Sequence, residues 1–162
     1  MNYSFPRKKP SPVPKIIVTP EYLAKGSLKK SYINTKLAFN VPWMGVVAMA
    51  FAKYPFFYNS LWQYMHPLTK SIEFDELCKK LLIISKKKAL ELKPKSLRKN
   101  LKKIGYNNYE IKKINEVNQI FTTGNMPYLI MATIARIFLE EGELLNTKSF
   151  KKIFRRKILK YM

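Results

Sequence analysis

The chain has few side chains that could act as catalytic bases, nucleophiles or metal ligands. Its only histidine is His66, in the stretch YMHPL, and its only cysteine is Cys78, in DELCKKLL. A histidine with no catalytic motif beside it is more typical of a helix C-terminus, where it meets the helix dipole. A lone cysteine on the apolar side of a helical pattern is usually a small buried hydrophobe. One copy of the chain therefore offers no disulfide framework, CxxC redox pair or Cys/His zinc site.

The acidic residues also lack a catalytic pattern. Glu73, Asp75 and Glu76 fall in the first turn of an expected helix, where negative charge is favourable. A second group, Glu140, Glu141 and Glu143, lies near an expected helix end and is typical of a solvated surface. The chain has no Walker loop, GxGxxG or HExxH motif. We therefore expect no metal and no cofactor.

Positive charge dominates the composition. The 162 residues include 31 Lys and Arg against 10 Asp and Glu, for a formal net charge of +21. The basic residues concentrate near the start (PRKKP), over residues 86–113 and over residues 148–160. Such charge favours binding to nucleic acid, an anionic membrane surface or an acidic protein. A lysine-rich composition that fills solvated helix faces would explain it equally well, so both interpretations stay open.

The length and the 47% apolar content predict a single folded domain. Residues 1–18 are rich in proline and predict an extended basic arm. We expect one helical domain over residues 19–162, ending in a basic amphipathic helix. No apolar core precedes residue 16, so no secretory signal is predicted. The longest apolar run, residues 41–52, is too short to cross a bilayer. We therefore expect an intracellular, cytoplasmic protein without a transmembrane span.

Helix signals begin at Thr19 and continue along the chain, and no segment shows sustained period-2 alternation. The sequence therefore predicts an all-α fold, a compact bundle of about seven to eight helices. Thr19 is expected to cap the first helix, with Pro20 at its first position. We expect helices over residues 19–39, 43–53, 55–66, 71–92, 97–105, 107–121, 127–142 and 148–162. Either Thr69 or Ser71 is expected to cap the fourth of them. The apolar helix over residues 43–53 should be the most buried, and TTGN should form a turn between the helices that flank it.

The order of these elements is informative. The segment YINTKLAFNVPWMGVVAMAFAKYPFFYNSLWQYMHP resembles the repeat of the group I 2-haloacid dehalogenases, with Val41-Pro42, Ala52, Pro55 and Trp62 in the expected places. A second block, IGYNNYEIKKINEVNQIFTTGNMPYLIMATIARIFLEEG, is similar to the family's later helix pair around a Gly-Asn-Pro-x-Tyr-Leu turn. There Gly124, Asn125, Tyr128 and Leu129 match, whereas Met126 replaces the usual proline, which has moved to Pro127. The resemblance covers roughly residues 20–142.

This resemblance implies an all-α fold of the AhpD-like helical type. The dehalogenases carry two such repeats in one chain, with the active site at their pseudo-twofold interface. Because this chain has one repeat, we expect a homodimer that rebuilds the two-repeat body. The AhpD-type peroxidases need a CxxC motif, which this chain lacks.

The chemistry that the resemblance implies is hydrolytic. An aspartate activates water, which displaces halide directly from C2 of a haloacid, without a covalent ester or a cofactor. In an ungapped comparison this aspartate falls eight residues before the motif proline, where the chain has Asn34. An amide cannot take the proton of water, and loss of a general base typically costs about 10²–10⁴-fold.

The implied pocket also includes several aromatic and polar residues. Asn125 could donate a hydrogen bond to the carboxylate of a small ligand. The remaining pocket residues on this reading are Tyr32, Pro42, Trp43, Trp62 and Tyr128.

Two functions remain open on the sequence. The first is a 2-haloacid dehalogenase whose activity is weak or lost, or whose base is displaced. The second is a non-catalytic helical scaffold or binding protein whose basic segments contact an acidic protein, RNA or a membrane surface.

Overall fold

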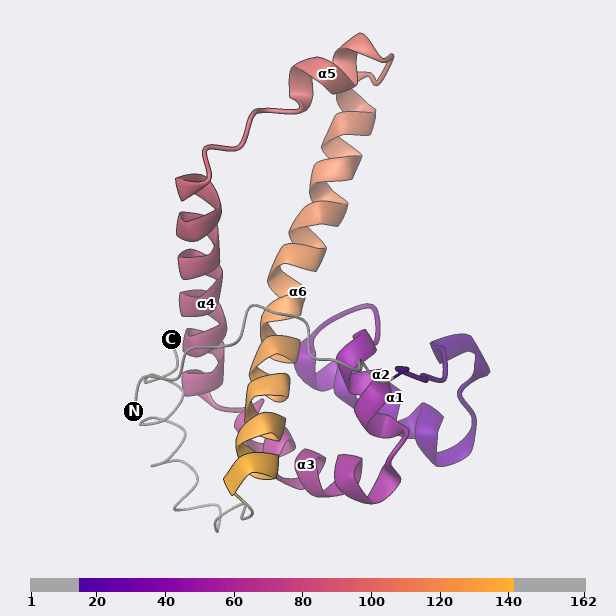
Figure 1. Ribbon diagram of the computed structural model, residues 1–162. Helices are drawn as coiled ribbons and strands as arrows, with labels where there is room; N and C mark the ends of the chain where they lie inside the picture. Colours follow the sequence, from indigo (N-terminus) through magenta and orange to yellow (C-terminus); the bar gives the residue numbers. More distant parts are fainter. Residues whose placement is uncertain (1–14, 142–162) are drawn as a thin grey trace.

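The computed structural model describes residues 15–141, and the regular elements of these residues are all helices, without strands (Figure 1). The all-α prediction is therefore confirmed. The elements are η1 (Glu21–Leu23), α1 (Gly26–Phe39), α2 (Val46–Ala52), α3 (Pro55–Leu68), α4 (Ile72–Glu91), α5 (Arg98–Lys103) and α6 (Asn108–Glu141). The expected arm before residue 15 and the expected helix after Thr147 lie outside the described residues.

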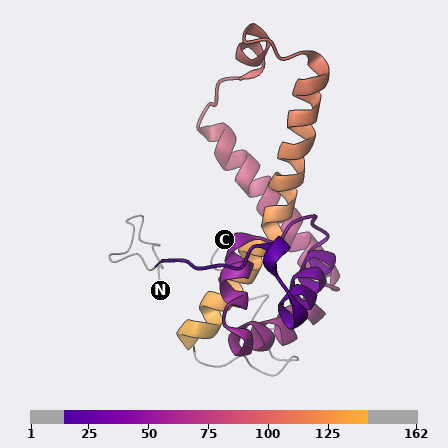
Figure 2. The ribbon, with the colours of Figure 1, turned by 90° about the vertical axis from the view of Figure 1, so that its right-hand side faces the viewer.

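The helices form two regions, which we call the body and the arm. The body consists of α1, α2, α3, the first half of α4 and the second half of α6 (Figures 1 and 2). The arm consists of the second half of α4, α5 and the first half of α6, and it extends away from the body to the α5 end. The 34 residues of α6 run through both regions. This one helix therefore links the packed region to the extended one.

Most of the fully buried core side chains come from α3 and α6. From α3, Tyr58, Leu61 and Met65 are almost fully buried, and they recur at the three- and four-residue spacing of one helix face. From α6, Ile130 and Ile134 face them in the same cluster. Burying each such side chain contributes roughly 1.5–3 kcal/mol relative to leaving it exposed. The body is thus the region where the sequence buries its apolar surface.

The predicted helix start at Thr19 is wrong. Pro20 precedes a single 3₁₀ turn, and α1 begins only at Gly26, where φ is 55°. The hydroxyl of Tyr32 donates to the Thr19 carbonyl oxygen at 2.8 Å. In one continuous helix, residues 13 apart would be separated by about 20 Å along the axis. The chain therefore folds back on α1, and that contact excludes a straight helix through Gly26.

The predicted start of the next helix at Trp43 is also wrong, because α2 begins at Val46. This helix is not the most buried element: Ala48 and Ala52 are buried, but Val46 and Val47 are exposed. Its apolar character therefore does not reflect burial on all sides.

The expected end at His66 is two residues short, because α3 runs to Leu68. Pro67 lies inside α3, next to its last residue. Proline disturbs a helix through its missing N–H and its ring, but at this position only a short stretch of helix remains to be disturbed. The next start was predicted at Thr69 or Ser71. Ser71 is the N-cap, and its hydroxyl oxygen accepts from the Phe74 N–H at 3.2 Å.

The predicted turn at TTGN does not exist, because α6 is continuous through it. The hydroxyls of Thr122 and Thr123 donate to carbonyl oxygens four residues earlier in the helix. Gly124 lies directly against the ring of Trp43 and the side chain of Val41, where a Cβ would not fit. Packing thus overrides the local turn signal. The described residues hold six α-helices because two predicted helices are joined in α6.

Candidate functional site

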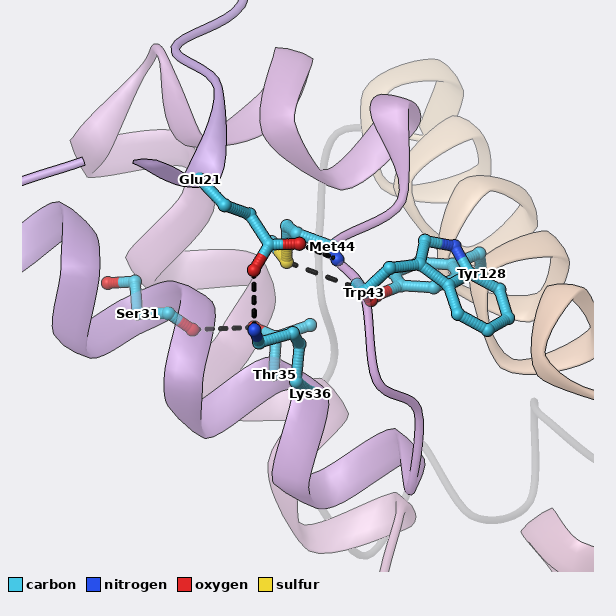
Figure 3. A network of polar contacts seen from close by, with 7 residues as sticks. All are labelled: Glu21, Ser31, Thr35, Lys36, Trp43, Met44 and Tyr128. Atoms are coloured by element: carbon cyan, nitrogen blue, oxygen red, sulfur yellow. Dashed lines mark hydrogen bonds and ion pairs between the residues drawn. The ribbon is translucent and has the colours of Figure 1, made fainter. Parts of the chain in front are cut away.

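The segment between α1 and α2, residues 40–45, is held from both sides (Figure 3). Asn40 ends α1 in the left-handed conformation, with φ 51°. The Val41 N–H then donates to the Lys36 carbonyl oxygen at 3.0 Å. We call residues 40–45 the α1–α2 loop. It carries Pro42 and Trp43, two of the predicted site residues.

Glu21 holds one side of this loop. Its carboxylate accepts hydrogen bonds from the Met44 backbone N–H and from the Lys36 ammonium group. Burial alone would raise the pKa of Glu21, but the hydrogen bonds from Lys36 and Met44 and the Lys36 charge leave it below the ordinary value of 4.5. A carboxylate stabilised in this way is a poor base. Glu21 therefore positions the loop and is not suited to activating water.

Tyr128 holds the other side of the loop. Its hydroxyl donates to the Trp43 carbonyl oxygen at 2.7 Å, across 85 residues of sequence. A Cβ at Gly45 would lie 2.8 Å from the Tyr128 ring, so glycine permits this close approach. Burial raises the pKa of Tyr128 to about 12. The phenol therefore stays protonated and acts as a hydrogen-bond donor at neutral pH.

The inner face of α1 fixes the rotation of that helix. Thr35 is fully buried, and its hydroxyl contacts both the Ser31 carbonyl oxygen, at 2.8 Å, and the Tyr58 hydroxyl. Burial raises the pKa of Tyr58 to about 12. Tyr32 is buried on the same side of α1. Since successive helical residues are turned by about 100°, Asn34 faces a different direction from Tyr32 and Thr35.

Asn34 lines an open pocket of about 390 Å³ between α1 and the end of α3. From α1 the pocket also takes Leu37 and Ala38, which share the face of Asn34. The other side is formed by His66, Thr69 and Lys70.

The lining combines the apolar side chains of Leu37 and Ala38 with a few polar groups, and Asn34, Leu37 and Lys70 are exposed to solvent. The Asn34 amide and the Lys70 ammonium group can donate hydrogen bonds to an anion. The Thr69 hydroxyl already donates to the His66 carbonyl oxygen at 2.8 Å. No aspartate or glutamate of the described chain lines this pocket. The arrangement suits a small carboxylate with an apolar substituent.

The predicted site residues fall into separate groups. Trp62 reaches the pocket indirectly, with its ring centroid 5.7 Å from that of His66. Trp43 and Tyr128 meet at the α1–α2 loop, where Pro42 is exposed. Asn125 is exposed on α6 and does not line the Asn34 pocket. The expected role of Asn125 toward a ligand carboxylate, like that of Asn34, stays a prediction.

Three pocket residues were missed by the sequence reasoning: His66, Thr69 and Lys70. The sequence predicts His66 only as a helix-end residue, and its position in the last turn of α3 matches this. Their spacing, three and four residues after His66, places Thr69 and Lys70 beside it at the end of a helix. That spacing is the signal that could have grouped them, although nothing in it indicates that they face Asn34.

Within residues 15–141 no group of three or more His, Cys, Asp or Glu side chains could hold a metal ion. None of the helices described is both long enough and apolar enough to span a membrane.

Comparison with known proteins identifies similar chains. No model of a protein family matches this chain. An (R)-2-haloacid dehalogenase of Rhizobium sp. (strain NHG3) is 38% identical over 142 residues, covering 86% of this chain and 54% of the relative. An (R)-2-haloacid dehalogenase of Pseudomonas putida is 33% identical over 148 residues, covering 87% of this chain and 46% of the relative. The chain thus spans about half the length of the curated relatives it matches.

Solved structures agree with this result. A D-2-haloacid dehalogenase mutant in complex with D-2-CPA matches with a TM-score of 0.70 at 33% identity, covering 77% of this chain and 44% of that one. Another D-2-haloacid dehalogenase mutant matches with a TM-score of 0.73 at 32% identity, covering 83% of this chain and 47% of that one.

Proposed function

Because the chain is a relative of the (R)-2-haloacid dehalogenases that spans about half of their length, we propose that it forms one repeat of a dehalogenase-type body. In this proposal the repeat is of the AhpD-like helical type, and a second copy completes the body. The Asn34 pocket binds a small carboxylate, and hydrolysis of 2-haloacids is weak or lost.

One observation supports the loss of hydrolysis: the pocket that Asn34 lines contains no carboxylate among the described residues. Direct attack of water at C2 needs a group that accepts the water proton as the bond to carbon forms. The Asn34 amide can orient a water molecule but cannot accept its proton. Glu21 cannot substitute, because its carboxylate is occupied by Lys36 and the Met44 N–H. Binding without turnover is therefore the expected behaviour.

The pocket can be tested with the only histidine as a reporter. We expect the imidazole NMR signals of His66 to shift saturably when 2-chloropropionate is added, because His66 lines the pocket. Propionamide, which lacks the carboxylate charge, should shift them far less. Lys70→Gln should weaken carboxylate binding by about tenfold, the value of one charge-assisted hydrogen bond. The matched change Lys79→Gln, on the exposed surface of α4, should leave binding unchanged. Unmoved His66 signals would exclude this pocket as the carboxylate site.

A second candidate is an active enzyme with a displaced base. His66 favours it, because an imidazole in the same pocket as Asn34 can accept a proton from water. In that case the wild-type protein releases chloride from 2-chloropropionate, and His66→Gln lowers the rate about 10²–10⁴-fold. Chloride release that is absent in the wild type, or unchanged in His66→Gln, would reject this candidate.

The basic surface supports a third, non-catalytic reading. Most residues from Ile83 to Glu110, which include the lysine-rich end of α4 and all of α5, are exposed. A surface of this kind attracts acidic proteins, RNA or anionic membranes through non-specific electrostatics. Removing the charges of Lys99, Lys102 and Lys103 together should then reduce salt-sensitive retention on heparin. An equal reduction on removing Lys25, Lys29 and Lys30 of the body would show that only total charge matters.

A further inference from the structure

The first half of α6 exposes an apolar surface that the body does not cover. Ile114, Val117, Ile120 and Phe121 are 41–52% exposed. We call these four residues the α6 stripe. With about 100° between successive residues, they fall within one side of the helix. Exposed apolar side chains that lie together on one side of a helix are candidates for a protein-binding surface.

The stripe continues a contact that the body already uses. Gly124 and Tyr128 lie on the same side of α6, and both pack against the α1–α2 loop. Phe121 lies at the edge of this contact, with its ring centroid 4.5 Å from that of Trp43. One side of α6 is therefore covered in the body and uncovered in the arm, where it is equally apolar.

The charge along this part of α6 differs from that of the rest of the chain. From Asn108 to Pro127 the charged residues are Glu110, Lys112, Lys113 and Glu116, which balance. Lys113 and Glu116 form an ion pair at 2.9 Å. The whole chain carries +21. Two copies can therefore approach along α6 without the repulsion that two lysine-rich α5 regions would meet. A polyanion, in contrast, would be attracted to α5 and not to a neutral apolar stripe.

The lengths of the relatives indicate how much protein is needed to cover the α6 stripe. The solved dehalogenases align with 77–83% of this chain but with only 44–47% of their own chains. They thus contain about as much additional protein as this chain supplies, whereas one copy here leaves the stripe exposed.

We infer that the α6 stripe is the interface at which a second copy of this chain binds, with the two stripes packed against each other across a twofold axis. In such an interface the same surface serves both copies, so a self-complementary apolar stripe without net charge is well suited to it. This inference rests on the proposal that two copies rebuild the body of the longer relatives. It adds the residues through which they meet.

Sedimentation velocity of the wild type and two variants tests this interface. Val117→Glu places a charge in the middle of the stripe and should raise the dimer dissociation constant by at least about tenfold. The matched control Asn115→Glu adds the same charge to an exposed position on another side of the same helix turn. It should change the dimer dissociation constant by less than about twofold. Both positions are exposed and glutamate favours helix, so circular dichroism should show both variants folded.

Cross-linking gives an independent readout. In a Cys78→Ser background, Val117→Cys should form a disulfide-linked dimer on mild oxidation, because equivalent residues near a twofold axis lie close together. Asn115→Cys should not. A wild type that stays monomeric up to about 100 μM overturns the inference. So does a dimer that both glutamate variants weaken equally. Neither readout depends on halide release or on the His66 signals, so failure here is distinct from failure of the proposed site.

Discussion

The two halves of α6 have similar apolar patterns but opposite environments. In the body, Ile130 and Ile134 are 1–2% exposed and pack in the core, whereas in the arm Ile114 and Val117 are 41% and 52% exposed. Helical periodicity is present in both halves. Ile130 and Ile134 lie on a different side of α6 from Ile114 and Val117. The difference therefore shows that helical periodicity alone does not decide burial, which also needs a packed partner.

The largest expected effect follows directly from this contrast. Ile134→Ala removes buried methyl and methylene groups from the core and should lower the free energy of unfolding by about 2–5 kcal/mol. Ile114→Ala, the same change in the arm, should lower the free energy of unfolding of the monomer by less than about 1 kcal/mol. Urea unfolding at a concentration where the protein is monomeric measures both. Equal losses would show that the two halves do not differ as described.

A smaller effect is expected where the two halves join. Gly124→Ala places a Cβ against the Trp43 ring and Val41, and should cost about 1–3 kcal/mol, as overpacking does. In a free helix the same change would stabilise by roughly 1 kcal/mol, because alanine favours helix more than glycine does. The sign of the effect therefore tells whether the loop packs here. Thr123→Ala, one residue earlier and exposed, is the control and should stay within about 0.5 kcal/mol.

The smallest effect concerns Glu21, which holds the α1–α2 loop on which α6 packs. Its folded pKa is below the ordinary value of 4.5, so its stabilising contribution is present above that pH and is lost as pH falls through the folded pKa. Glu21→Gln should cost about 1 kcal/mol at pH 7, the value of a partly exposed ion pair with one hydrogen bond. The difference from wild type should shrink below pH 4.5.

Unfolding of both proteins between pH 3 and pH 7 measures this difference. A gap that stays constant over that range would contradict the ion-pair role of Glu21. Glu76→Gln, an exposed change on α4, controls for the general loss of one acidic residue.

These effects also separate what local sequence can predict from what it cannot. Pro55 at a first helical position, Ser71 as an N-cap and Gly105 after α5 are local signals, and the structure uses all three. The false turn at TTGN and the false helix start at Thr19 depend on distant contacts. Tyr128 reaches Trp43 across 85 residues, and Tyr32 reaches back to Thr19. No window of a few residues contains both partners of such a contact.

The candidate site shows the same limit. The sequence singled out Asn34 through a family resemblance, and helix geometry relates it to Leu37 and Ala38 on one face. It could not indicate that the end of α3 lies opposite, because that requires the packing of α1 and α3 through Thr35 and Tyr58. His66, Thr69 and Lys70 therefore became part of the site only with the fold.

The central proposal is that the chain forms one repeat of a dehalogenase-type body and has Asn34 where a carboxylate would activate water. Chloride release from 2-chloropropionate by Asn34→Asp, compared with the wild type, tests it most directly. We expect the variant to exceed the wild type by about 10²-fold or more, the typical contribution of a general base. Asn59→Asp, which adds the same charge to an exposed position of α3, should not differ from the wild type. Equal rates for Asn34→Asp and Asn59→Asp would contradict the claim.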